Sequence, residues 1–128
     1  QFSLDRSQPP EFHYELGKEL SSLRERGVLI LGSGNIVHNL RMAVFQHGAY
    51  DWAIEFDETL KNLISSGDLT PIIHYETLGT TARLSIPTNE HYLPLLYALA
   101  LKGEQEPLRF FADQVTMGSI SMRSVWIG

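Results

Sequence analysis

Apolar side chains recur every three or four residues in several parts of this chain, with polar residues between them. The first such series predicts an amphipathic helix that begins at the proline pair of residues 9–10 and ends before Gly27. Its apolar members are Phe12, Leu16, Leu20 and Leu23. A second series predicts a helix from Asp51, as the N-cap, to Gly67, with Trp52, Phe56, Leu60, Leu63 and Ile64 as its buried stripe.

A short continuous apolar run at residues 28–31 predicts a buried strand of the kind found in parallel sheets. The apolar residues before Pro9 predict an earlier strand, so that strand, helix and strand form a βαβ unit. At the other end, residues 108–115 and 119–127 predict two strands around Met117 and Gly118, a hairpin. The expected fold is one α/β domain over residues 1–128, with a mixed, partly parallel sheet flanked by helices and a C-terminal β-hairpin.

The segment between the second helix and the hairpin is less regular. Pro71 predicts the start of a short helix through Tyr75, and residues 79–87 are expected to form a loop. Thr88 is a candidate N-cap for the leucine-rich helix that follows, but Pro94 would break such a helix in its interior. The helix therefore either begins near Pro94 or kinks there, and His91 lies in a nonstandard backbone in both cases.

Composition excludes several classes of function. The net charge is −5 and Lys and Arg form no cluster, so neither DNA nor RNA is expected as a partner. No apolar stretch is long enough to span a bilayer, so no membrane partner is expected. The first residues lack the features of a signal peptide, and cysteine is absent, which excludes disulfides and thiolate metal sites. These features fit a cytoplasmic protein.

Two of the five histidines occupy positions where chemistry is expected. His38 and His91 each lie between a loop and an apolar element, and both a structural and a chemical role stay open for them on spacing alone. His13 is expected to be solvated on the first helix, His47 to lie in an exposed loop, and His74 to be packed or hydrogen-bonded. Two histidines do not complete a catalytic metal site, which usually has three protein ligands and an open position. Glu90, next to His91, is a candidate carboxylate ligand.

The glycines before His38 first suggest a dinucleotide-binding loop. Gly32 and Gly34 follow the predicted strand, but Val37 stands where a third small residue is needed. The acidic residue expected about 20 positions later should end a strand, whereas Glu55 lies within a predicted helix. A nucleotide-binding function is therefore rejected.

Three longer stretches resemble one enzyme family. These are S-G-N-I-V-H-N-L at residues 33–40, E-H-Y-L-P-L-L-Y at residues 90–97 and M-G-S-I-S-M at residues 117–122. The chain resembles the class III extradiol ring-cleavage dioxygenases, in the branch called 4,5-DOPA dioxygenase extradiol. The matches span nearly the whole chain, but they correspond to the C-terminal half of the family.

The resemblance implies a non-haem metal site, with Fe(II) expected and Zn(II) possible in the same place. A catechol and O2 are the implied substrates, and the ring would open beside the two hydroxyls. His91 is implied as a metal ligand and His38 as a ligand or as the catalytic acid/base, with Glu90 as an alternative ligand. Imidazole suits both metals, and a histidine titrates near neutral pH, as proton transfer requires. Asn35, Asn39 or a backbone carbonyl is a candidate to hold the second ring nitrogen of a ligand.

The family also carries two metal-binding histidines in N-terminal motifs that this sequence lacks. The isolated 128 residues are therefore expected to be inactive, and the N-terminal half of the same protein is an expected partner. The alternative is an inactive fragment or interaction module that retains the fold. The aromatic residues Tyr50, Trp52 and Tyr92 are candidates to stack on a substrate ring, although core packing would explain them equally well.

Overall fold

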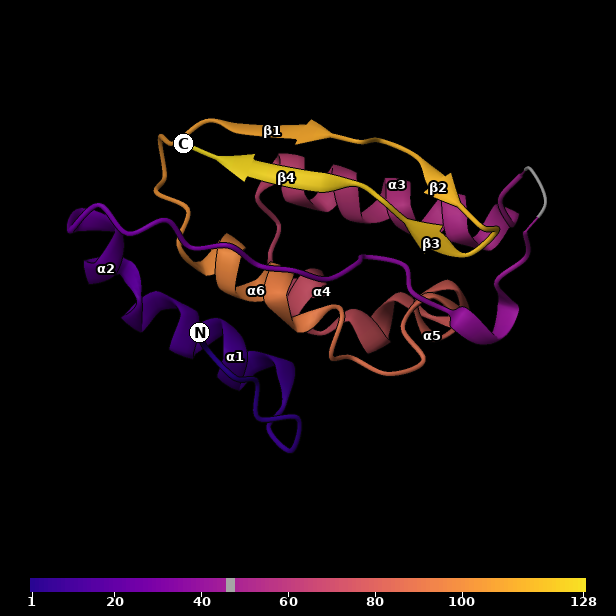
Figure 1. The fold of residues 1–128 in the computed structure, drawn as a ribbon, viewed down its shortest axis with the longest axis horizontal. Coiled ribbons are helices and arrows are strands. Elements are labelled where there is room, and N and C mark those ends of the chain that lie inside the picture. The colour runs from indigo at the N-terminus through magenta and orange to yellow at the C-terminus, as the bar shows by residue number, and fades with distance from the viewer. Residues whose placement is uncertain (46–47) are drawn as a thin grey trace.

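A computed structural model describes residues 1–45 and 48–128, and Figure 1 shows its course. The helices of the first part are α1 (Pro10–Glu19), α2 (Ser21–Glu25) and the 3₁₀ turn η1 (Leu40–Met42). The central helices are α3 (Asp51–Ser66), α4 (Thr70–Ile73), η2 (Tyr75–Leu78), α5 (Thr80–Ser85) and α6 (Leu93–Ala100). The strands are β1 (Leu108–Phe111), β2 (Val115–Thr116), β3 (Ile120–Ser121) and β4 (Ser124–Ile127).

Helices α1 and α6 pack closely because a glycine lies at their crossing. A Cβ on Gly17 would lie 2.8 Å from the Cβ of Ala100, so a side chain there would push the helices apart. Helix α6 is buried along most of its length and forms the centre of the core together with α3. It begins at Leu93 with Pro94 in its first turn, where a proline costs no hydrogen bond. Of the two alternatives for this helix, a start near Pro94 is confirmed.

The predicted C-terminal hairpin is confirmed, although it is divided into two ladders. Strand β1 pairs antiparallel with β4, and β2 pairs antiparallel with β3. The interruption lies at Ala112, which has a φ of 53°, and the turn is made by Met117 and Gly118, which also have positive φ. Figure 1 shows the hairpin lying over α3, with its turn at the end of the molecule opposite the C-terminus.

The predicted strand at residues 28–31 does not form, nor does the strand expected before Pro9. The N–H of Val28 donates to the carbonyl of Leu23, and residues 29–33 form an unpaired segment that crosses the molecule between α6 and the hairpin (Figure 1). A strand needs a hydrogen-bonded neighbour, and none lies beside these residues in the described part of the chain. The expected fold class is confirmed as helices plus a C-terminal hairpin, whereas the parallel part of the sheet is not observed here: the strand pairs of the described residues are antiparallel.

Three smaller predictions were wrong. Residues 80–85 of the expected loop form helix α5, which packs on α3 and buries Ala82 completely. The first predicted helix ends earlier and continues as the separate α2. Asp51 is the first residue of α3 rather than its cap, which is Tyr50. The short helix expected from Pro71 is present as α4 and η2, and no helix of the described residues is long and apolar enough to cross a membrane.

Candidate functional site

The structure brings the two candidate histidines together. The rings of His38 and His91 stack with their centroids 3.7 Å apart and their planes inclined by 24°. His38 comes from the segment before η1, and His91 from the turn before α6. Both side chains are half-buried, so each is held by the protein and remains accessible from one side.

His38 is positioned by main-chain hydrogen bonds on both sides of its segment. Its own N–H donates to the carbonyl of Ser85, at the end of α5. On the other side, the segment pairs with the hairpin, because the N–H of Ser121 donates to the carbonyl of Val37 and the N–H of Asn39 donates to that of Ser119. His38 is thus placed where a short extension of the β2–β3 ladder meets a helix end.

His91 is positioned by the glycine that precedes the His38 segment. The N–H of Asn35 donates to the carbonyl of His91 at 2.8 Å. This approach requires a residue without a side chain at position 34, because a Cβ on Gly34 would lie only 2.0 Å from the same carbonyl oxygen. The glycines that first suggested a phosphate-binding loop therefore allow two loops to touch, which places one histidine against the other.

The electrostatics of the pair favour a neutral His38. Burial lowers the pKa of His38, and the neighbouring His91 lowers it further, while Glu90 acts in the opposite direction. A neutral imidazole is the form that binds a metal or accepts a proton. The Glu90 carboxyl is ionised at neutral pH, because a backbone hydrogen bond lowers its pKa and the Thr88 hydroxyl donates to it.

A metal ion suits these two imidazoles in kind, but they are too few to hold one in a catalytic site. Over residues 1–45 and 48–128, no group of three His, Cys, Asp or Glu side chains has the spacing to hold a metal. The Glu90 Oε2 atom is buried without a hydrogen bond, 3.6 Å from Nη2 of Arg6. The two imidazoles therefore fit at most one side of a metal site, and a catalytic site would need ligands in addition to them.

A pocket of about 160 Å³ opens beside His91. Gly34, Asn35, Phe111 and Arg123 are among its lining residues, whereas His38 is not. The pocket lies between the loop at Gly34, α6 and the hairpin, so it gives space next to one of the two histidines.

The two asparagines that were expected to hold an imidazole have other partners. The amide of Asn35 donates to the carbonyl of Ser121, and that of Asn39 donates to the carbonyl of Leu84. Through these hydrogen bonds to main-chain carbonyls, both side chains attach the His38 segment to its neighbours in the fold. The aromatic candidates are likewise engaged: Tyr92 is buried, with its hydroxyl donating to the carbonyl of Ile72, and Tyr50 stacks on Trp52.

The other histidines lie apart from the pair. His13 was expected to be solvated, which was wrong: it is completely buried, with Nδ1 2.9 Å from the hydroxyl of Tyr97. His74 is partly exposed and lies 3.3 Å from a carboxylate oxygen of Glu11, consistent with the expected polar contact. His47 lies outside the described residues.

A buried charge cluster beside the pocket was not anticipated from the sequence. Arg123 has a side chain only 2% exposed and binds Asp57 of α3 through Nε at 2.9 Å and Nη2 at 2.5 Å. It also pairs with Glu58 and Asp113. Burial opposes the positive charge, but these carboxylates together raise the pKa of Arg123 above its ordinary value.

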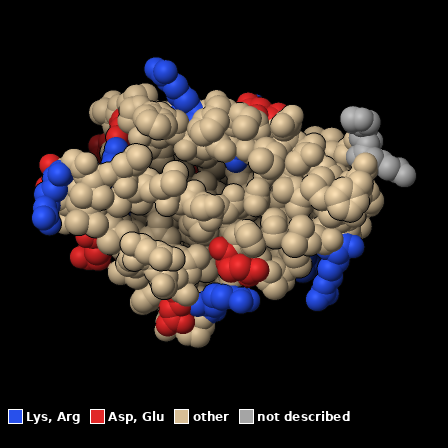
Figure 2. All heavy atoms as spheres, in the orientation of Figure 1, with Lys and Arg blue, Asp and Glu red and all other residues tan. Residues whose placement is uncertain are grey.

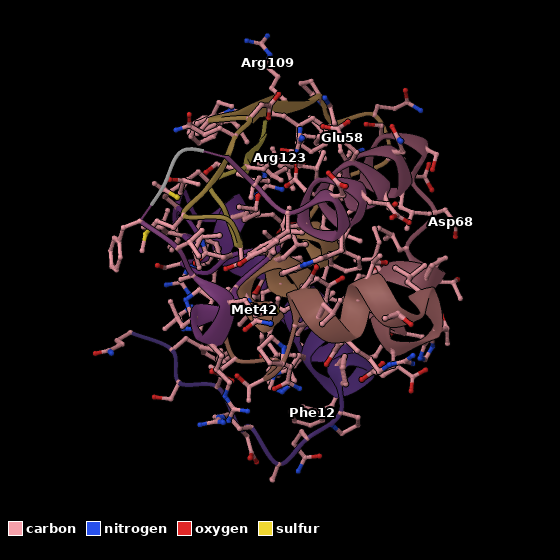
Figure 3. All side chains as sticks on the ribbon, turned by 90° about the vertical axis from the view of Figure 1, so that its right-hand side faces the viewer. Phe12, Met42, Glu58, Asp68, Arg109 and Arg123 are labelled. Atoms are coloured by element: carbon pink, nitrogen blue, oxygen red, sulfur yellow. The ribbon has the colours of Figure 1, made fainter. Side chains whose placement is uncertain are left out.

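Figure 3 shows Arg123 pointing inward next to Glu58, whereas Arg109 of β1 points to solvent. Through Asp57, the cluster also accepts the Ser121 hydroxyl at 2.5 Å, so it attaches the hairpin to α3. Helical periodicity could have flagged Asp57, because it lies four residues after Ala53 and three before Leu60, which are both buried on α3.

Comparison with known proteins identifies relatives of the whole chain. Residues 6–124 match the family model described as the catalytic LigB subunit of aromatic ring-opening dioxygenase. The chain is 45% identical to the "4,5-DOPA dioxygenase extradiol" of Escherichia coli K12 over its full length, which is 49% of that protein. It is 33% identical to the protein of the same name from Beta vulgaris, over 88% of this chain and 42% of that one.

A solved structure has the same fold. It is described as the crystal structure of uncharacterized protein JW3007 from Escherichia coli K12, and it matches with a TM-score of 0.88 and 41% identity. The match covers 98% of this chain and 53% of that one. The chain therefore spans about half the length of the relatives it matches, and it corresponds to their C-terminal half.

Proposed function

The chain belongs to the LigB family of aromatic ring-opening dioxygenases, and on this premise we propose that it forms the C-terminal half of a class III extradiol dioxygenase. The reaction is the opening of a DOPA-like catechol by O2, with both oxygen atoms entering the ring-opened product. The observation that supports this most directly is the stacked pair of His38 and His91, which come from two stretches that resemble the family's motifs.

In the proposed site, His91 serves as a metal ligand and His38 as a ligand or as the acid/base. A bound Fe(II) ion, or Zn(II) in its place, would supply the positive charge that holds the catecholate and the position at which O2 is activated. His38 is suited to accept a proton from a catechol hydroxyl at a ring nitrogen, because its lowered pKa keeps it neutral at neutral pH. Glu90 would keep a negative charge next to both rings, or act as the alternative ligand.

In this proposal, the complete site requires the N-terminal half of the same protein. The relatives are about twice as long, and the described residues provide too few ligands for a catalytic metal. We therefore expect the isolated 128 residues to be inactive and the N-terminal half of the protein to supply the missing ligands. The alternative, an interaction module without chemistry, predicts that the chain is inactive both alone and together with the N-terminal half.

The experiment compares histidine variants in the protein that contains both halves. Ring opening is followed by O2 uptake and by the yellow product of a catechol substrate, and metal content is measured on the same samples. His91→Ala is expected to lose both metal and turnover. If His38 is the acid/base, His38→Ala loses turnover and keeps its metal; if His38 is a ligand, it loses both.

His74→Ala is the matched control, because it removes a partly exposed histidine outside the pair. It should retain turnover and metal. Normal turnover and metal content in His91→Ala would refute its assignment as a ligand, and the same result for His38→Ala would make that residue structural. No ring opening by the unaltered protein with Fe(II), catechol and O2 would favour the interaction module.

A further inference from the structure

The unpaired segment, residues 29–33, exposes both its backbone and its apolar side chains. In the described part of the chain, none of its N–H or C=O groups takes part in a hydrogen bond. Leu31 is 86% exposed and Leu29 is 77% exposed, although both belong to an apolar run typical of a buried strand. An extended apolar backbone without hydrogen-bond partners can pair with an added strand on either side.

Each side of the unpaired segment opens into a cleft. One cleft, of about 580 Å³, separates it from the N-terminal residues Phe2 and Leu4 and from α2. The other, of about 480 Å³, separates it from β4 and from Phe111. Strand β4 pairs only with β1 in the described residues, and its residues 125–127 line this second cleft. Figure 1 shows the unpaired segment on the side of β4 away from β1. The clefts thus lie where neighbouring strands of one sheet would be.

The surrounding face is apolar. The exposed side chains of Phe2, Val28, Phe111 and Trp126 line the same two clefts. Figure 2 shows charged side chains mainly around the rim of this face, with a hollowed centre that is largely uncharged. An apolar, hollowed centre with a charged rim is typical of a protein–protein interface.

We propose that the unpaired segment is a central strand of a larger sheet, and that the N-terminal half of the protein inserts a strand into each flanking cleft and covers Leu29 and Leu31. This rests on the proposed function only in so far as that function assigns an N-terminal half to the complete enzyme. The length of the relatives supports this occupant, because the solved neighbour contains the same fold within a chain of about twice the length. Strand addition would satisfy the free backbone groups and bury the exposed leucines together.

The test measures amide hydrogen exchange rather than turnover, so its failure is distinct from a failure of the proposed chemistry. The probes are this chain alone and this chain fused behind the N-terminal half of the E. coli relative. Amides of residues 29–33 are expected to exchange within seconds in the chain alone and at least 100-fold more slowly in the fusion. Equal exchange in both proteins would overturn the proposal.

A charged variant identifies the side chains involved. Leu31→Asp should leave the circular dichroism of the chain alone unchanged, because the side chain is exposed, and should lower protection of residues 29–33 in the fusion at least tenfold. Ile54→Lys, an exposed apolar position on α3 outside both clefts, is the matched control and should not change protection. Protection that survives Leu31→Asp would refute the docking surface. Protection of these residues in a dimer of the chain alone would instead assign the clefts to a second copy.

Discussion

Replacement of Gly34 by alanine tests how the two histidines are held together. The φ of Gly34 is not in the left-handed region, so the backbone itself accepts alanine. The obstacle is contact: the new Cβ would lie 2.0 Å from the His91 carbonyl oxygen and 2.9 Å from its carbon. Because the neighbour is main chain and cannot rotate away, the two loops must separate by about 1 Å or more to restore ordinary contact.

This separation has a cost that the structure allows us to estimate. The loops lose the hydrogen bond from the Asn35 N–H to the His91 carbonyl, about 1 kcal/mol, and overpacking adds about 1–3 kcal/mol. Gly34→Ala should therefore lower the free energy of unfolding by about 2–4 kcal/mol. Since a misplacement of about 1 Å can cost about 100-fold in rate, turnover of the complete enzyme should fall by a similar factor.

The stability effect is measured by urea unfolding of the 128-residue chain, followed by circular dichroism. Gly103→Ala is the matched control, because a Cβ there meets only ordinary contacts at 3.7 Å and φ is not positive. The control should unfold within about 0.5 kcal/mol of the wild type. If Gly34→Ala unfolds like the control and keeps full turnover and metal content, the close approach of the two loops does not hold His91 in place.

Three further substitutions test the packing around the site by the same unfolding assay. Arg123→Met should lower the free energy of unfolding by about 3–5 kcal/mol, because it leaves Asp57 buried without its partner. Asp57→Asn in the same chain should recover much of this loss, and a loss below about 1 kcal/mol for Arg123→Met alone would contradict the buried pair. Glu106→Gln should lower the free energy of unfolding by about 1 kcal/mol at pH 7, because it removes the ion pair with Arg24. Hydrogen bonding to Arg24 lowers the pKa of Glu106 to about 2, so this stabilisation is complete above the ordinary carboxyl pKa and disappears as the pH falls towards 2. A cost that does not change with pH would refute it. Tyr92→Phe should lower the free energy of unfolding by about 1–2 kcal/mol, because it removes a buried hydrogen bond to the carbonyl of Ile72. An unchanged unfolding midpoint would show that this hydrogen bond contributes nothing.

Local patterns predicted most of the helices and the C-terminal hairpin. Helix α3 and the start of α6 at the Pro94 turn follow from spacing, because the side chains that define one face of a helix are close in sequence. Helix α5 was missed since its short threonine-rich sequence has a weak propensity, and its stability comes from packing on α3.

The sequence by itself determined the family motifs, and with them the choice of His38 and His91. It could not show that the rings stack, because that contact depends on a glycine that lets two distant loops touch. Nor could it show that His13 is buried or that Arg123 joins the hairpin to α3, since both depend on partners far away in the chain.

The apolar run at residues 28–31 separates the two kinds of information most clearly. Its composition predicts a strand in the interior of a sheet. Whether they form a strand was decided by the tertiary structure, because backbone hydrogen bonds require neighbours and the described part of this chain supplies none beside them. The preference for a helix or a strand depends on residues close in sequence, whereas strand pairing and ligand sets form only when segments distant in sequence come together.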